Sequence, residues 1–232
     1  MSKEAFIFIL GLMVFAAALY WLAQANTKDR QTMAEILGMV VVQKGEEERG
    51  KDYVLGNFRQ SLAMQGEMHG RPAGVWVRSV RRFTKHNSKN MSLQTVLAFD
   101  LKGESQTAFR IEPALTGKLQ SWFGGDQPVI SSGDPEFDRL FRFTSQDSSA
   151  AIQILNPEMR NQLLAFRKAV VGDMPNSDLG RFSGDLMMGI FAVEGNRATY
   201  TVAGTPSEKI ARHFAMAGPF LAEFAERLQK QA

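Results

Sequence analysis

The sequence has no cysteine among its 232 residues and only three histidines, His69, His86 and His213. The absence of cysteine excludes disulfides, thiolate metal sites and a cysteine nucleophile. The histidines are far apart, and none belongs to an H-x-x-x-H pair. His213 lies between apolar positions near the C-terminus, which favours a packed histidine over a metal ligand. The composition therefore predicts neither a metal centre nor a cofactor.

Motifs of known reactive sites are also missing. The sequence contains no G-x-S-x-G elbow, Walker A loop, G-x-G-x-x-G fingerprint, H-E-x-x-H pair or EF-hand loop. Carboxylates are present at Asp134, Glu136, Asp138 and Asp185, but Asp134 to Glu136 is more simply a turn followed by a helix start. A net charge of +3 is too small to indicate nucleic acid as a partner by itself. We therefore predict no catalytic residues.

One long uncharged segment lies near the N-terminus. Ala5 to Thr27 (AFIFILGLMVFAAALYWLAQANT) includes no Asp, Glu, Lys or Arg. A helix of these 23 residues would be about 34 Å long, whereas the hydrocarbon core of a bilayer is about 30 Å thick. Tyr20 and Trp21 lie near one end, where aromatic rings favour the membrane interface. The segment predicts a transmembrane anchor over residues 1–27, with these two rings at the interface.

Two other interpretations of this segment stay open. One is a buried helix of a soluble core. The other is a signal peptide cleaved at the A-x-A pattern Ala23-Gln24-Ala25, although the apolar run exceeds the roughly 7–15 residues of a signal-peptide core. Lys3 precedes the segment, and Lys28 and Arg30 follow it, so the count of basic residues favours a cytoplasmic C-terminal side.

The remainder of the chain predicts two halves that each combine strands with helices. Residues 28–120 begin with a helical face at Met33 to Val41 and continue with alternating strands near residues 62–68, 75–80, 93–101 and 107–111, as in an antiparallel meander. A Gly- and Pro-containing linker over 121–132 opens the segment 121–232. The sequence predicts an α+β fold of antiparallel sheets with packed helices, in two halves of similar size.

The second half contains clear helix and turn signals. Asn156-Pro157-Glu158 is a helix start, and Ser148 or Ser149 is expected to cap a helix before it. Glu194 to Arg197 predicts a hairpin turn. Thr205 to Glu208 reads as a capping box that starts the final helix, and Gly218-Pro219 predicts a kink or split in that helix.

One segment concentrates positive charge. The segment from Met68 to Phe99 contains no Asp or Glu. It contains six basic residues: Arg71, Arg78, Arg81, Arg82, Lys85 and Lys89. Trp76 and Phe83 are interleaved with them, and Lys85 to Asn90 is expected at a hairpin tip. Near a bilayer such a hairpin attracts anionic lipid at about 1 kcal/mol per basic residue. A solvated two-stranded ribbon explains the same charges without any ligand.

Several short motifs are distributed over nearly the whole chain. They are Met33 to Gly38 (MAEILG), Met64 to Gly66 with Gly70-Arg71, Gln94 to Val96, Ile111 to Pro113, Gly124 to Asp126, Gly133 to Phe137 and Leu155 to Glu158 (LNPE). Together they resemble a bacterial family of single-pass membrane-anchored proteins of unknown function. The resemblance implies an anchor in the inner membrane, a basic patch, a cytoplasmic α+β region and no catalytic residues. The family commonly has an Arg run after the anchor, where this chain has only Lys28 and Arg30.

Three functional hypotheses follow. The first is a non-catalytic accessory or scaffold subunit, whose partners are the lipid bilayer and other membrane protein subunits. The second is a module that binds anionic lipid head groups or an acidic ligand through Arg78, Arg81, Arg82 and Lys85, with Trp76 beside them. The third is an enzyme with scattered carboxylates, which predicts a pocket of converging acids with shifted pKa values.

Overall fold

Residues 27–42, 58–83, 89–102, 109–114, 128–172 and 187–231 are described by the computed structural model of the chain. Thr27 is the only residue of the predicted anchor within these ranges, and Tyr20, Trp21 and Lys85 lie outside them. None of the helices in the described ranges is both long enough and apolar enough to cross a bilayer.

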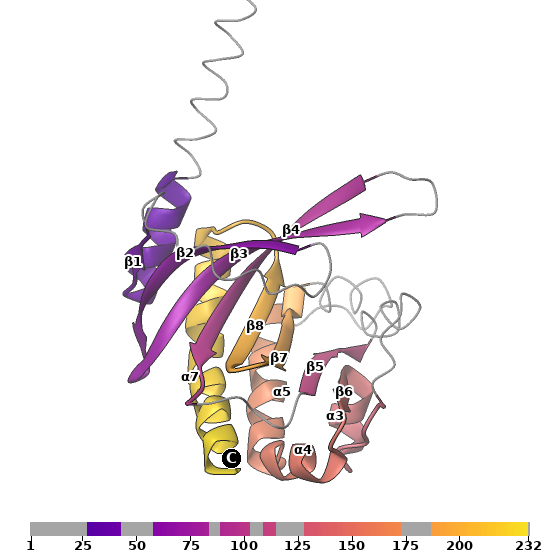
Figure 1. Ribbon diagram of the computed structural model, residues 1–232. Helices are drawn as coiled ribbons and strands as arrows, with labels where there is room; N and C mark the ends of the chain where they lie inside the picture. Colours follow the sequence, from indigo (N-terminus) through magenta and orange to yellow (C-terminus); the bar gives the residue numbers. More distant parts are fainter. Residues whose placement is uncertain are drawn as a thin grey trace, which may run out of the picture.

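A single antiparallel sheet of eight strands organises the described residues (Figure 1). The strands are β1 (Val40–Val41), β2 (Phe58–Met68), β3 (Arg71–Phe83), β4 (Lys89–Asp100), β5 (Phe109–Pro113), β6 (Phe141–Ser145), β7 (Ile190–Glu194) and β8 (Arg197–Ala203). Their order across the sheet is β1-β2-β3-β4-β8-β7-β5-β6, and each paired strand is antiparallel to its neighbour. The predicted α+β class with an antiparallel sheet and packed helices is confirmed.

The sheet crosses the predicted boundary near residue 120. β8 lies between β4 and β7, and β5 pairs with both β6 and β7. The register places Leu97 opposite Tyr200 and Ile111 opposite Phe143. The described parts of segments 28–120 and 121–232 therefore build one sheet together, because their edge strands complete each other's backbone hydrogen bonds.

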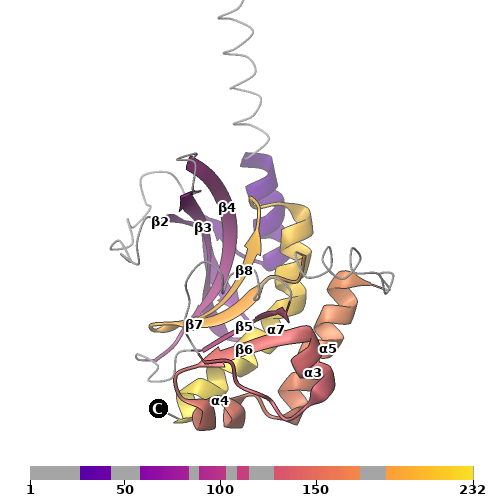
Figure 2. The same cartoon turned by 90° about the vertical axis from the view of Figure 1, so that its right-hand side faces the viewer.

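Helices lie along one side of this sheet (Figure 2). They are a helix over residues 27–37, α3 (Pro135–Leu140), α4 (Ser148–Ile154), α5 (Pro157–Val171) and α7 (Glu208–Gln231). Asn156 caps α5 as predicted, because its side chain accepts a hydrogen bond from the Met159 backbone N–H. The cap of α4 is Asp147 instead of a serine, since its carboxylate accepts from the backbone N–H groups of Ser149 and Ala150.

For the last helix, the predicted capping residue and the predicted split at Gly218-Pro219 were wrong. Ser207, not Thr205, supplies the hydroxyl at its start, and the Ile210 backbone N–H donates to that hydroxyl at 3.4 Å. The helix also runs unbroken from Glu208 to Gln231 with Pro219 inside it. Pro219 and Ala215 both lie on the exposed side of α7, so water can reach the carbonyl oxygen that the proline leaves without a donor.

The main core lies between the helices and one face of the sheet. Alternate residues of the central strands, such as Val75, Leu97 and Tyr200, point into it. Rings from β5, β6, β7, β8, α5 and α7 pack edge-to-face or stacked with centroid separations of 4.4–6.0 Å. The helix over 27–37 belongs to the same core, because Met33, Ala34 and Leu37 are buried in it.

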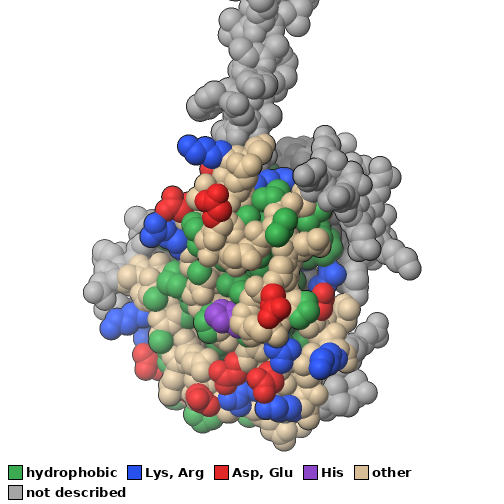
Figure 3. Space-filling view, turned by 90° about the vertical axis from the view of Figure 1, so that its left-hand side faces the viewer, with side chains coloured by type: hydrophobic (Ala, Val, Ile, Leu, Met, Phe, Trp, Pro, Cys, Tyr) green, Lys and Arg blue, Asp and Glu red, His purple; other side chains and the backbone are tan. Residues whose placement is uncertain are grey.

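The side of the molecule that bears β1 shows hydrophobic side chains scattered among charged ones (Figure 3). Ile36 and Val40 contribute to the exposed apolar surface with 40% and 70% of their area accessible. Isolated exposed apolar residues are normal on a protein surface, so they do not by themselves define a binding site.

Candidate lipid- or partner-binding surface

The predicted basic hairpin is formed by β3 and β4. Their register pairs Arg81 with Met91, Arg82 with Asn90 and Phe83 with Lys89. Three basic residues therefore occupy the last paired positions of this hairpin. The pairing brings Arg81, Arg82 and Lys89 to one end of the sheet, and Lys85 lies outside the described residues.

This end of the hairpin lies at the end of the molecule where the described chain begins. In both ribbon views the free end of β3 and β4, the first turn of helix 27–37 and the first turn of α7 lie toward the top (Figures 1 and 2). Backbone contacts join two of these parts, since the Gly204 N–H just before α7 donates to the Leu93 carbonyl of β4 at 2.8 Å. The Thr95 hydroxyl donates to the Gly204 carbonyl at 2.9 Å.

Of the two predicted site residues whose burial the structure describes, Trp76 is buried and Arg78 is half-buried. Only 8% of the area of Trp76 is accessible, and it packs with Leu62, Val96 and Ala98 on the sheet face opposite the main core. The Arg197 guanidinium lies 4.6 Å from the centroid of its ring, a cation–π geometry. The ring thus stabilises the sheet and is already covered by an arginine.

Arg197 was missed by the sequence analysis, which assigned it only to a turn. It stands at the start of β8, opposite Asp100 of β4, and its Nε donates to the Asp100 carboxylate at 3.0 Å. Its contact with Trp76 of β3 crosses the intervening strand β4, because β4 lies between β3 and β8. Only the strand order could have revealed this pair. Arg78, two residues after Trp76 on the same strand, is half-buried on that sheet face.

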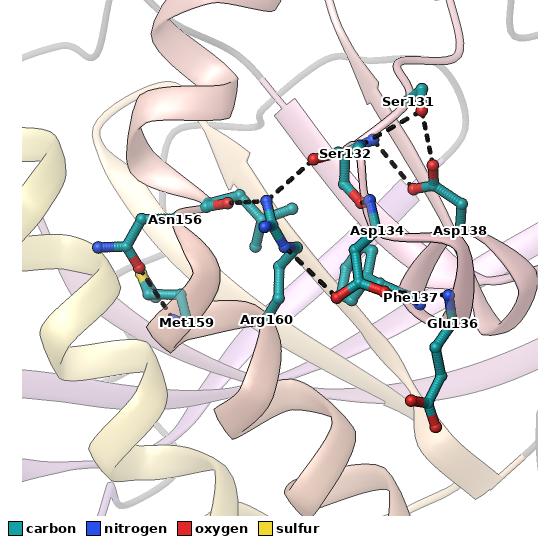
Figure 4. Close-up of polar contacts among 11 residues, drawn as sticks. Ser131, Ser132, Asp134, Glu136, Phe137, Asp138, Asn156, Met159 and Arg160 are labelled. Atoms are coloured by element: carbon teal, nitrogen blue, oxygen red, sulfur yellow. Dashed lines mark hydrogen bonds and ion pairs between the residues drawn. The ribbon is translucent and has the colours of Figure 1, made fainter.

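A second polar cluster joins the start of α3 to α5 (Figure 4). Asp134 caps α3 by accepting from the backbone N–H groups of Glu136 and Phe137. Arg160 of α5 donates to the carbonyls of Ser132 and Leu155 at 3.0 and 3.2 Å, and its Nε lies 3.8 Å from the Asp134 carboxylate. The arginine therefore fastens the loop before α3 onto α5.

The carboxylate of Asp138 belongs to this cluster. Burial raises its pKa, but hydrogen bonds from Ser132 and Ser131, with the positive charge of Arg160, outweigh burial and hold the pKa below its ordinary value. The Ser131 hydroxyl donates at 2.7 Å and the Ser132 backbone N–H at 3.0 Å. A carboxylate whose pKa is lowered and which already accepts two hydrogen bonds is a weak proton acceptor, so Asp138 suits holding the loop before α3 better than general-base chemistry.

Two further buried polar groups lie apart from the hairpin. Glu112 of β5 is 3% exposed, and its carboxylate lies 2.8 Å from Arg110 Nε and 3.6 Å from Arg142 Nη1. His213 of α7 is 7% exposed, and burial followed by the charge of Lys209 lowers its pKa. His213 is thus packed as the sequence predicted. Within the described ranges, no group of three or more His, Asp and Glu residues could hold a metal ion.

Comparisons with known proteins leave this chain without an assigned family. No family model and no curated protein matches it. Among solved structures, the crystal structure of the mycobacterial trehalose monomycolate transport factor A, TtfA, is similar with a TM-score of 0.47 and 12% identity, over 88% of this chain and 94% of that one. This similarity is too distant to carry a function from one chain to the other, and the resemblance to the membrane-anchored family stays a prediction.

Proposed function

We propose that this protein is a non-catalytic, single-pass membrane-anchored accessory subunit that docks on a larger membrane protein complex. The uncharged segment Ala5 to Thr27 is its anchor, in a bacterial inner membrane, and the α+β body faces the cytoplasm. The body offers its partner a rigid docking surface at a fixed height above the bilayer.

The observation that supports this proposal is that the chain is already helical at Thr27, the last residue of the uncharged segment, and stays helical to residue 37. Within three turns of Thr27, Met33, Ala34 and Leu37 are buried in the main core. Every residue from Thr27 to Met33 is helical, so an anchor in lipid that ended at Thr27 would hold the whole body in a set orientation. That arrangement suits a docking subunit better than a tethered domain that must search for its substrate.

We expect the full chain to stay in the membrane pellet after alkaline washing and to crosslink there to a discrete neighbour. The absence of cysteine allows a single photo-crosslinker on V40C, at an exposed position of β1. The double variant M13R/A16R places two arginines inside the uncharged segment, at a cost of about 2.5–3.5 kcal/mol each in a bilayer centre. It should move to the supernatant and lose the crosslinked band.

The matched control is V129R/I152R, which adds the same charges at exposed positions of the body. It should remain in the pellet and keep the crosslinked band. If the unmodified protein were extracted by alkaline washing, the anchor would be refuted. A membrane-bound protein that gave only self-crosslinks or none would refute the accessory role.

A second candidate function is recognition of anionic lipid or an acidic ligand by the basic hairpin. The specific observation in its favour is that Arg81, Arg82 and Lys89 occupy the same end of the body as the start of helix 27–37. A hairpin at that end would stand beside the head groups if the anchor is inserted.

Binding of anionic lipid by the hairpin can be distinguished from anchoring alone by flotation of the full chain, in mild detergent, with lipid nanodiscs. The quantity compared is the binding of the chain to discs of different lipid composition. The variant R78A/R81A/R82A/K85A should lose preference for phosphatidylserine discs over phosphatidylcholine discs. At about 1 kcal/mol per basic residue, the preference should fall by on the order of 100-fold or more. Unchanged preference would assign these charges to solvation of a two-stranded ribbon.

A further inference from the structure

Charge is distributed unequally between the two ends of the body. The first described turn, 27–30, and the first residues of α7, 208–212, lie at the same end in Figures 1 and 2. Together they hold four basic residues and two acids: Lys28, Arg30, Lys209, Arg212, Asp29 and Glu208. The opposite end, built by α3, β6, α4, the start of α5 and the end of α7 over 134–160 and 223–230, holds seven acids and five basic residues: Asp134, Glu136, Asp138, Asp147, Glu158, Glu223, Glu226, Arg139, Arg142, Arg160, Arg227 and Lys230. The body therefore has a basic end and an acidic end.

The basic charges are accessible. Lys28, Lys209 and Arg212 are exposed, and Arg30 is half-buried. Arg212 is paired with Glu208 at 2.6 Å, but both side chains are mostly exposed, with 72% and 57% of their areas accessible. An exposed i,i+4 pair contributes only about 0.3–0.5 kcal/mol, so a lipid phosphate can replace the carboxylate as partner.

We propose that the basic end of the body lies directly on an anionic bilayer surface, with Lys28, Lys209 and Arg212 in contact with the lipid head groups. This inference rests on the membrane anchor of the proposed function and specifies the orientation that the anchor imposes. The uncharged segment ends at Thr27, so an inserted anchor would deliver this end, and not the acidic one, to the head groups.

Distances favour contact at one end only. α7 contains 24 residues and is therefore about 36 Å long. At physiological salt the electric field of a charged surface decays over a distance of about 8 Å. The bilayer thus attracts the basic end, while the acids of α3 and α4 lie too far away to be repelled. Charge and chain connection select the same orientation independently.

Energy transfer from a single dye to lipid-bound acceptors measures this orientation in the full chain reconstituted into vesicles. The dye is placed on T205C, exposed just before α7, or on I152C in α4 at the acidic end. The chain connection holds this end near the bilayer in any lipid, so the charges are tested by the effect of anionic lipid. Replacing part of the phosphatidylcholine by phosphatidylserine should increase transfer from T205C several-fold and leave transfer from I152C unchanged. The variant K28Q/K209Q/R212Q should lose most of this increase, since three contacts at about 1 kcal/mol each shift the population in contact on the order of 100-fold.

The matched control is K102Q/R139Q/K230Q, which removes three exposed basic residues from the other end. It should keep the increase that phosphatidylserine causes at T205C. No increase at T205C, or an increase that persists in K28Q/K209Q/R212Q, would overturn the inference while leaving the anchor intact. Failure of the unmodified protein to float with any vesicle would instead refute the anchor itself, so the two proposals fail in distinguishable ways.

Discussion

Replacing Gly189 by alanine should destabilise the fold by about 3 kcal/mol or more. Gly189 precedes β7 and has a φ of +73°, where L-residues with a Cβ are strained. A Cβ atom there would lie 2.7 Å from the Thr201 carbonyl oxygen and 2.8 Å from the Tyr200 ring. The substitution thus combines an unfavourable backbone conformation with overlap against two buried groups.

The ring of Tyr200 cannot move to relieve this overlap. It is fully buried, stacks on Phe191 at a centroid distance of 4.4 Å and meets Phe166 and Phe214 edge-on. Its hydroxyl donates to the Met188 carbonyl at 2.6 Å, and burial raises its pKa well above the ordinary value. The residue before Gly189 is therefore fixed to the same ring that the new Cβ would strike.

Urea unfolding of the full chain in mild detergent measures the effect, with G38A as the control. Gly38 also has a positive φ, +65°, but nothing lies within 4 Å of the Cβ position there. G38A should therefore cost only the conformational strain, about 1–2 kcal/mol. Equal losses for the two variants would show that contact with Tyr200 and Thr201 does not matter.

The sequence predicts those parts of the fold that depend on residues close together in the chain, such as single strands, tight turns and helix starts. The alternation near 93–101 predicts β4, Glu194 to Arg197 predicts the β7–β8 hairpin, and Asn156 predicts the start of α5. The order of strands could not be predicted in this way. The insertion of β8 between β4 and β7 depends on pairing of Leu97 with Tyr200, residues more than a hundred positions apart. Local alternation carries no information on such partners.

The candidate surface was predictable to a similar extent. The run of basic residues over 71–89 was visible in the sequence, and the structure places the described part of that run on paired strands. The burial of Trp76 under Arg197 was not visible, because the two meet across an intervening strand. The continuity of α7 through Pro219 was also hidden, since it depends on which side of the helix faces solvent.

A single substitution in β7 should unfold the two predicted halves together. Phe191 is 1% exposed, and its ring lies 4.4 Å from Tyr200, 4.9 Å from Phe220 and 5.6 Å from Phe166. Phe191→Ala removes a ring that joins β7 to β8, α7 and α5, and a buried Phe→Ala change costs about 3–5 kcal/mol. Since β8 also pairs with β4, the loss should reach the strands of segment 28–120.

Trp76 reports on that segment, because it lies in β3 and is buried. In a W21F/W122F background it is the only tryptophan, so its fluorescence follows the first half while far-ultraviolet circular dichroism follows the whole chain. Phe191→Ala should shift both transitions to the same lower urea concentration, whereas V129A, at a position 61% exposed, should shift neither. A Trp76 transition that stayed at its original midpoint would mean that the halves unfold independently. That outcome would contradict one cooperative sheet, because β4 cannot keep its pairing with β8 once β8 has unfolded.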